Sequence, residues 1–138
     1  MAFLKVLIVD DSAKWRTFVQ WQLSLDPEAQ VVGIAADGLE AVQRAAELQP
    51  DVILLDIQLP ILDGIEAARQ IAQAAPHSAI LLMSNESDPE MIRAAFSAGG
   101  KGFVLKRDIV DDLFAAMEAV TLGKRFLSRS LVKFDDLI

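Results

Sequence analysis

The sequence predicts an α/β fold in which a parallel β-sheet is covered by helices on both faces. Short apolar runs alternate five times with longer segments whose apolar residues recur at helical spacing. The run Val52–Leu55 is continuously apolar, as expected of a strand that is buried on both sides. The chain has 138 residues, 53% of them hydrophobic, which fits one domain with a sizeable core.

The elements follow one another in the order expected of five βα units. The predicted strands are Phe3–Val9, Gln30–Ala35, Asp51–Leu55, Ala79–Met83 and Gly102–Leu105. The predicted helices are Ala13–Leu25, Leu39–Leu48, Ile65–Ala74, Pro89–Ala98 and Val110–Leu122. After Gly123 the pattern fades, so we expect a domain over residues 1–123 and a C-terminal extension or linker stub over residues 124–138.

Composition excludes several classes of function. The formal net charge of −7 disfavours direct binding of this chain to DNA or to an anionic membrane. The absence of cysteine excludes disulfides, thiolate catalysis and cysteine-based metal sites. No signal peptide or apolar run of spanning length is recognisable, so a cytoplasmic protein is expected.

Polar residues follow the strands at the edge where an open parallel sheet binds its ligands. Asp10 and Asp11 come after the first strand, Asp56 after the third, Ser84 after the fourth and Lys106 after the fifth. If the strand order is 2-1-3-4-5, the topological switch point lies between strands one and three. The three aspartates would then converge there.

Three carboxylates in one crevice repel one another, and a divalent cation would relieve that repulsion. Mg²⁺ suits the site because it prefers oxygen ligands and is usually held by few carboxylates together with a phosphate. Lys106 offers a positive charge to an anionic group, and Ser84 offers a hydroxyl donor. This set of residues predicts a phosphoryl-handling site with a carboxylate nucleophile.

These motifs resemble those of the two-component response-regulator receiver domain, the CheY-like family. The resemblance covers residues 3 to about 123 and rests on several stretches together. They are Val9-Asp10-Asp11-Ser12, Pro50 to Asp56, Leu59-Pro60 with Asp63-Gly64, and Ala98 to Lys106.

The resemblance implies a role for each matching residue. Asp56 would be the phosphoacceptor. Asp10, Asp11, Asp56 and the backbone carbonyl of Gln58 would serve Mg²⁺. Lys106 would contact the phosphoryl oxygens. Ser84 would be the switch hydroxyl, and Phe103 the switch aromatic that turns inward. The implied fold is a flavodoxin-like (βα)5 three-layer sandwich, and the implied phosphodonor is a sensor histidine kinase or phosphotransfer protein. The domain itself would be a signalling phosphoacceptor and not an enzyme.

Within that family, the likeness is greatest to receivers of the LuxR/NarL-type DNA-binding regulators. It is carried by Gln30 to Gly33, Ser84-Asn85 and Gly123 to Ser128. If a helix-turn-helix domain follows in the full-length protein, the output would be transcription.

Other interpretations fit parts of the pattern. Phe103 could simply be a core residue, and Ser84 could cap a loop. A flavodoxin-like redox protein would want a Ser/Thr/Gly-rich phosphate loop where Asp10 and Asp11 stand. A phosphatase with an aspartate nucleophile would usually have a second acid at the position of Gln58. A receiver-like module without phosphate turnover is disfavoured because all the key residues are present.

The outer face of the first helix suggests a contact surface. Phe18 and Trp21 are three residues apart, and Gln22 and Leu25 extend the same face. Phe114 lies outside the inward register of the fifth helix, which should neighbour the first. We therefore predict a homodimer through the first and fifth helices.

Overall fold

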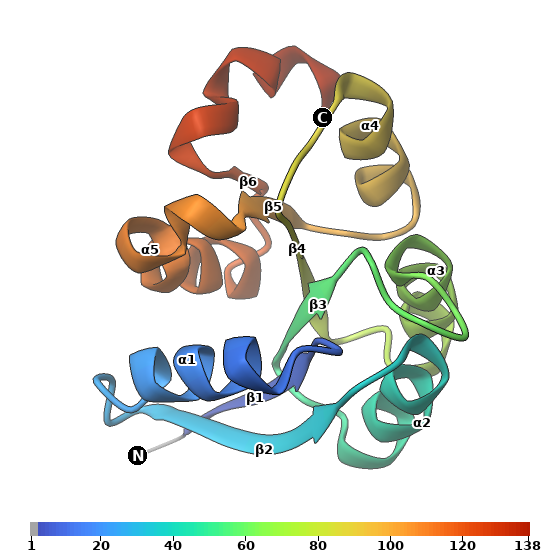
Figure 1. Ribbon diagram of the computed structural model, residues 1–138, viewed down its shortest axis with the longest axis vertical. Coiled ribbons are helices and arrows are strands. Elements are labelled where there is room, and N and C mark those ends of the chain that lie inside the picture. The colour runs from blue at the N-terminus through green and yellow to red at the C-terminus, as the bar shows by residue number, and fades with distance from the viewer. Residues whose placement is uncertain (1–2) are drawn as a thin grey trace.

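A six-stranded parallel sheet organises the chain, as Figure 1 shows in a computed structural model that describes residues 3–138. The strands are β1 (Leu4–Val9), β2 (Ala29–Ala35), β3 (Val52–Asp56), β4 (Ala79–Ser84), β5 (Gly102–Leu105) and β6 (Phe126–Leu127). Their order is β2-β1-β3-β4-β5-β6. The predicted order 2-1-3-4-5 is therefore confirmed, with a short sixth strand added beside β5.

Helices cover both faces of the sheet, as predicted (Figure 1). They are α1 (Ala13–Leu23), α2 (Gly38–Leu48), α3 (Gly64–Ala74), α4 (Pro89–Ser97) and α5 (Ile109–Thr121), with 3-10 segments η1 (Lys106–Asp108) and η2 (Arg129–Leu137). Helices α1 and α5 pack on one face, and α2, α3 and α4 pack on the other. Within residues 3–138, no helix combines the length and the apolar character needed to cross a membrane.

The sheet divides the core into two layers because successive strand residues point to opposite faces. Leu7 and Val9 of β1 belong to the layer under α2 to α4, whereas Val6 and Ile8 belong to the layer under α1 and α5. All four side chains are fully buried. Each such side chain contributes about 1.5–3 kcal/mol relative to an exposed one, so the burial fixes the register of β1.

Four of the five α-helices begin at a polar cap. The side chains of Ser12, Asp37, Asp63 and Asp88 each accept a hydrogen bond from a backbone N–H in the first turn of the helix that follows. Helix α3 also depends on Gly64, because a Cβ there would lie 2.2 Å from the carbonyl oxygen of Asp56. The end of β3 and the start of α3 can therefore pack closely beneath the aspartate.

Some predicted boundaries differ from the structure. Helix α1 ends at Leu23 rather than Leu25, and the N–H of Ser24 closes its last turn on the carbonyls of Gln20 and Trp21. Asp51 lies before β3, where its carboxylate accepts a hydrogen bond from the N–H of Lys5. Gln22 was expected on the outer face of α1, but it is 5% exposed and therefore buried.

Residues after Gly123 fold back against the sheet. Phe126 and Leu127 pair in parallel with Gly102 and Phe103, and Leu131 in η2 is buried in the core layer under α4. The segment lies next to α4 at the red end of the chain in Figure 1. Because β6 runs parallel to β5, η2 begins at the carboxyl end of the sheet, where η1 also begins.

A buried aspartate anchors this C-terminal segment. Asp108, at the end of η1, accepts hydrogen bonds from the hydroxyls of Ser128 and Ser130 at 2.7 and 2.8 Å. The Ser128 hydroxyl in turn accepts the N–H of Leu105 at 3.1 Å. Burial raises the pKa of Asp108, but the hydrogen bonds from Ser128 and Ser130 outweigh it, and the pKa stays below its ordinary value.

Candidate functional site

The candidate site lies at the carboxyl end of the sheet, where β1, β3 and β5 deliver their last residues. Asp10 and Asp11 follow β1, Asp56 ends β3, and Lys106 follows β5 directly. Strands β1 and β3 are neighbours whose connections run to opposite faces, so their carboxyl ends form the topological switch point, where open parallel sheets bind their ligands. The structure thus brings together the four charged residues that the sequence assigned to this edge.

Three aspartates form the acidic part of the site. One carboxylate oxygen from each of Asp10, Asp11 and Asp56 lies within 4.8 Å of the others. Asp10 is fully buried and Asp56 is 4% exposed, whereas Asp11 is exposed. The cluster therefore has two sheltered carboxylates and one that opens to solvent.

Asp10 is held on both carboxylate oxygens. Its Oδ1 accepts the N–H of Ser12 at 2.8 Å, and its Oδ2 accepts the Lys106 ammonium at 2.7 Å. The guanidinium of Arg16 donates to the Asp10 carbonyl oxygen at 2.6 Å. The buried carboxylate is therefore paired and hydrogen-bonded, which offsets the cost of burying it.

Lys106 faces two of the aspartates. Its Nζ lies 3.7 Å from Oδ2 of Asp56 in addition to its contact with Asp10, and its side chain is only 10% exposed. A compact ammonium at this position can reach an anionic group attached to Asp56.

The Asp56 carboxyl is the most perturbed group of the site. Burial is the main cause, and with the negative charge of Asp10 it raises the pKa of Asp56 to about 6, although Lys106 and the N–H of Gln58 act in the opposite direction. A carboxyl in a crevice whose pKa is shifted by burial and a charged partner is a candidate functional group. Around neutral pH it is still mainly ionised.

The donor set fits a hard divalent cation. Carboxylate oxygens are the ligands that Mg²⁺ prefers, and the cluster offers few protein ligands with one side open to water. Burial, and after it the negative charge of Asp10, disfavours the ionised form of Asp56. A divalent cation bound to these carboxylates would favour that form.

The remaining predicted residues surround the cluster. The N–H of Gln58 points to Oδ1 of Asp56 at 3.4 Å, and the role expected of its carbonyl stays a prediction. Ser84 ends β4, is fully buried, and accepts the N–H of Glu86 at 3.2 Å. Phe103 is also fully buried, so an inward turn of its ring cannot start from this conformation.

Trp15 is a further neighbour of the site. The sequence puts it on the inward face of the first helix and nearer the site than Trp21, and in the structure its ring lies 4.8 Å from Nζ of Lys106. It stands three residues after the Ser12 cap, at the end of α1 nearest the aspartates.

Comparison with known proteins identifies the family of this chain. The family model of the response regulator receiver domain matches residues 6–118. The chain belongs to that family. As a receiver domain it is a signalling module of two-component response regulators, with relatives among the LuxR- and NarL-type regulators.

Two curated relatives are similar to the chain in sequence. The chain is 42% identical over 106 residues to a protein-glutamate methylesterase/protein-glutamine glutaminase of Methanospirillum hungatei, covering 75% of this chain and 31% of that protein. It is 32% identical over 124 residues to the transcriptional regulatory protein DegU of Brevibacillus brevis, covering 90% of this chain and 52% of that protein. The receiver therefore spans about half, or less, of these relatives.

A solved structure matches over nearly the whole receiver. It is a two-component response regulator of the LuxR family from Aurantimonas sp. SI85-9A1, with a TM-score of 0.90 and 31% identity, covering 96% of this chain and 94% of that one. The match confirms the predicted α/β receiver fold.

Proposed function

We propose that this receiver accepts a phosphoryl group on Asp56. The observation that carries the proposal is the position of Lys106, whose ammonium lies 2.7 Å from Asp10 and 3.7 Å from Asp56. The nucleophile and the positive charge that would neutralise the incoming group thus lie close together, and both side chains are largely buried. Membership of the receiver family supports the assignment.

The transfer follows from the chemistry of the two groups. An ionised oxygen of Asp56 attacks the phosphorus of a phosphohistidine, an acyl-phosphate bond forms, and the phosphorus–nitrogen bond breaks. The histidine nitrogen leaves with the electron pair and takes up a proton. Lys106 pairs with the oxygens of the transferred group, which carry about −1.5 to −2 charge. Charge stabilisation of this kind is the main contribution that a protein makes to phosphoryl transfer.

Mg²⁺ would be held by Asp10, Asp11 and Asp56, with the Gln58 carbonyl as a further proposed ligand. When bound, the cation supplies Lewis-acid stabilisation of phosphoryl charge. Asp11 is exposed and can meet the cation from the open side, while Asp10 is held in place by Ser12 and Lys106. The phosphodonor that we propose is a sensor histidine kinase or phosphotransfer protein in the cytoplasm, and the receiver would assist its own phosphorylation without being an enzyme.

Ser84 and Phe103 would couple the phosphoryl group to a change of shape. The Ser84 hydroxyl is bound to the loop through the N–H of Glu86, and it would exchange that partner for a phosphoryl oxygen. Because Phe103 is already buried, its contribution would be a repacking against the residues around β5 rather than an inward swing. Where a helix-turn-helix domain is encoded after this receiver and its extension at residues 124–138, the output would be transcription.

Intact mass spectrometry tests the phosphoacceptor. Incubation with Mg²⁺ and acetyl phosphate should add one phosphoryl group, and Asp56→Asn should abolish the addition. Asp51→Asn is the matched control, because Asp51 lies at the other end of the same strand and should leave phosphorylation unchanged. A phosphoryl group mapped by fragmentation to any other residue would refute the assignment.

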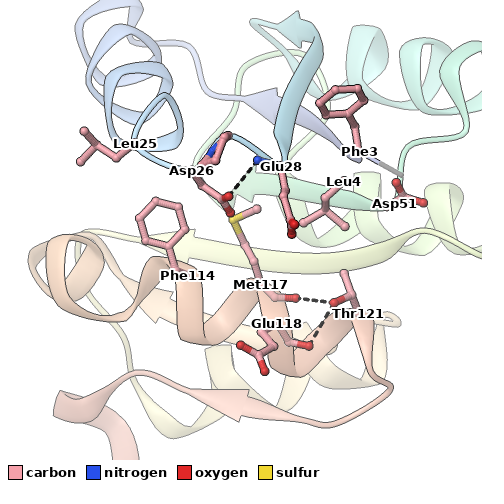
Figure 2. A pocket seen from close by; sticks show the side chains of 11 residues that line it. Phe3, Leu4, Leu25, Asp26, Glu28, Asp51, Phe114, Met117, Glu118 and Thr121 are labelled. Carbon is pink, nitrogen blue, oxygen red and sulfur yellow. Dashed lines mark hydrogen bonds between the residues drawn. The ribbon is translucent and has the colours of Figure 1, made fainter. Parts of the chain in front are cut away.

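The outer face of α1 beside α5 is the proposed surface for a homodimer. Trp21 and Leu25 are 58% and 61% exposed, whereas Phe18 and Phe114 are half-buried and pack against the core. Leu25 and Phe114 line a hollow of about 710 Å³, together with Asp26, Glu28 and Glu118 among others. Figure 2 shows these side chains from close by. Symmetric association would bring these acidic groups towards their counterparts, so we expect raised salt to favour the dimer.

A further inference from the structure

The ammonium of Lys106 has an aromatic neighbour as well as two acidic ones. Its Nζ lies 4.8 Å from the centre of the Trp15 ring, within the range of a cation–π interaction. Lys106 is the group that would meet the phosphoryl oxygens, and its side chain is 10% exposed. Its position therefore depends on what surrounds it on the α1 side as well as on Asp10.

Trp15 is itself held by the residues of the site. Its backbone N–H donates to the Ser12 hydroxyl at 3.2 Å, and the N–H of Ser12 donates to Asp10 at 2.8 Å. Asp10 in turn accepts a hydrogen bond from the Lys106 ammonium, and that ammonium lies over the indole ring of Trp15. Trp15 and Lys106 are therefore linked both directly and through Ser12 and Asp10. On its outer side, the ring contacts Phe18, with the centres 5.5 Å apart.

The indole is an unusual choice for simple packing at this position. Its Nε1–H is buried, and among residues 3–138 it is the one buried side-chain polar atom without a hydrogen-bond partner. A buried donor without an acceptor is unfavourable. A leucine or phenylalanine could pack against the same core layer without that cost, so packing alone does not account for a tryptophan.

We propose that Trp15 is a positioning residue for Lys106. The electron-rich face of the ring holds the flexible lysine against the crevice, so that the ammonium stays near Asp56 and does not swing into solvent. Tryptophan is the side chain whose face attracts a cation most strongly. The inference rests on the proposed function, because it assigns to Trp15 the alignment of the group that neutralises the phosphoryl charge.

A double-mutant cycle separates positioning from packing. Trp15→Leu should slow phosphorylation by acetyl phosphate roughly three- to tenfold at saturating Mg²⁺, and Trp15→Phe should restore most of the rate because it keeps a ring. In a Lys106→Met background, Trp15→Leu should cause no further slowing, since the residue through which it acts is gone. Equal slowing in both backgrounds would show that Trp15 serves only packing.

The control for this cycle is Gln20→Leu, which changes an exposed side chain elsewhere on the same helix. It should leave the rate unchanged. Urea unfolding of each variant reports stability separately, so a variant that is merely less stable is recognised.

A metal-free measurement tests the contact independently of phosphorylation. In a Trp21→Phe background, all tryptophan emission comes from Trp15, and Lys106→Met should shift its wavelength or intensity because a charge leaves the ring face. Lys5→Met, at the exposed N-terminal end of β1, should not. If Asp56 is not phosphorylated but the emission responds to Lys106→Met, the proposed function fails while the contact stands. An emission indifferent to Lys106 in the presence of normal Asp56 phosphorylation would overturn the role of Trp15.

Discussion

The ammonium of Lys106 lies 2.7 Å from the Asp10 carboxylate, although the two residues are 96 positions apart in the chain. Strands β1 and β5 do not neighbour each other in the sheet, so the pair spans the carboxyl ends of the strands between them. It both holds a buried carboxylate and keeps a cation 3.7 Å from Asp56.

Lys106→Met should therefore weaken the fold as well as slow phosphorylation. The variant leaves Asp10 and Asp56 without their shared cation, and breaking a buried pair in this way costs about 3 kcal/mol. Mg²⁺ should recover more of the unfolding free energy in the variant than in the wild type, because it can replace the missing positive charge. Urea unfolding with Mg²⁺ or EDTA measures both effects. Equal stabilisation of the two proteins by Mg²⁺ would contradict this explanation.

Asp56→Asn should stabilise the metal-free protein at neutral pH. Because burial and Asp10 raise the pKa of Asp56 from 3.8 to about 6, its contribution to stability is fully present below pH 3.8 and is lost as the pH rises through about 6. The difference between those two pKa values corresponds to about 3 kcal/mol. Asparagine has no charge to bury, so the variant does not lose stability as the pH rises.

Urea unfolding in EDTA between pH 4 and pH 8 is the measurement. The stability advantage of the asparagine variant should grow from about pH 4 to about pH 7 and then level off. An advantage that is constant across this range would mean that ionisation of Asp56 is not the cause.

Ser128→Ala should loosen the C-terminal segment. The Ser128 hydroxyl is fully buried and links the N–H of Leu105 to the carboxylate of Asp108. Its removal leaves a buried donor unsatisfied and should cost about 1–3 kcal/mol. Ser130→Ala is the matched comparison, because Ser130 also bonds Asp108 but is only half-buried, and it should cost less.

Hydrogen exchange locates the effect of these two variants. Amides of residues 126–137 should exchange faster in Ser128→Ala than in Ser130→Ala, while α2 and α3 stay unchanged. Uniformly faster exchange throughout the chain would indicate global destabilisation instead.

Much of the fold was predictable because it depends on local periodicity and caps. Strands β3 and β4 are buried throughout and apolar up to their last residues, Asp56 and Ser84. The caps Asp37, Asp63 and Asp88 stand just before their helices. Strand β6 was missed because two residues carry no periodicity. Its anchor pairs Ser128 with Asp108, which lie 20 residues apart in a stretch where the polar pattern resembles a linker.

The candidate site was also predictable only in part. The rule that ligands bind at the carboxyl ends of parallel strands was enough to assemble the three aspartates and Lys106, since it needs only the strand order. The contact between Trp15 and Lys106 joins α1 to the end of β5, and no spacing rule relates those elements. The full burial of Phe103 likewise depends on what covers β5 and not on the residue itself.

Trp21→Glu tests the proposed dimer surface on α1 and α5. Trp21 and Leu25 expose most of their apolar area, and aromatic side chains favour interface cores because they remove a large area from water at small entropic cost. If wild-type receivers associate through this face, a glutamate there should weaken association at least roughly tenfold, because it adds an unpaired charge to a surface already bordered by Asp26 and Glu118.

Leu39→Glu, on α2 across the sheet, is the control and should leave association unchanged. Sedimentation velocity at several protein concentrations, in low and in raised salt, gives the answer. A wild-type protein that stays monomeric at tens of micromolar in both buffers, with and without phosphorylation, would rule the surface out.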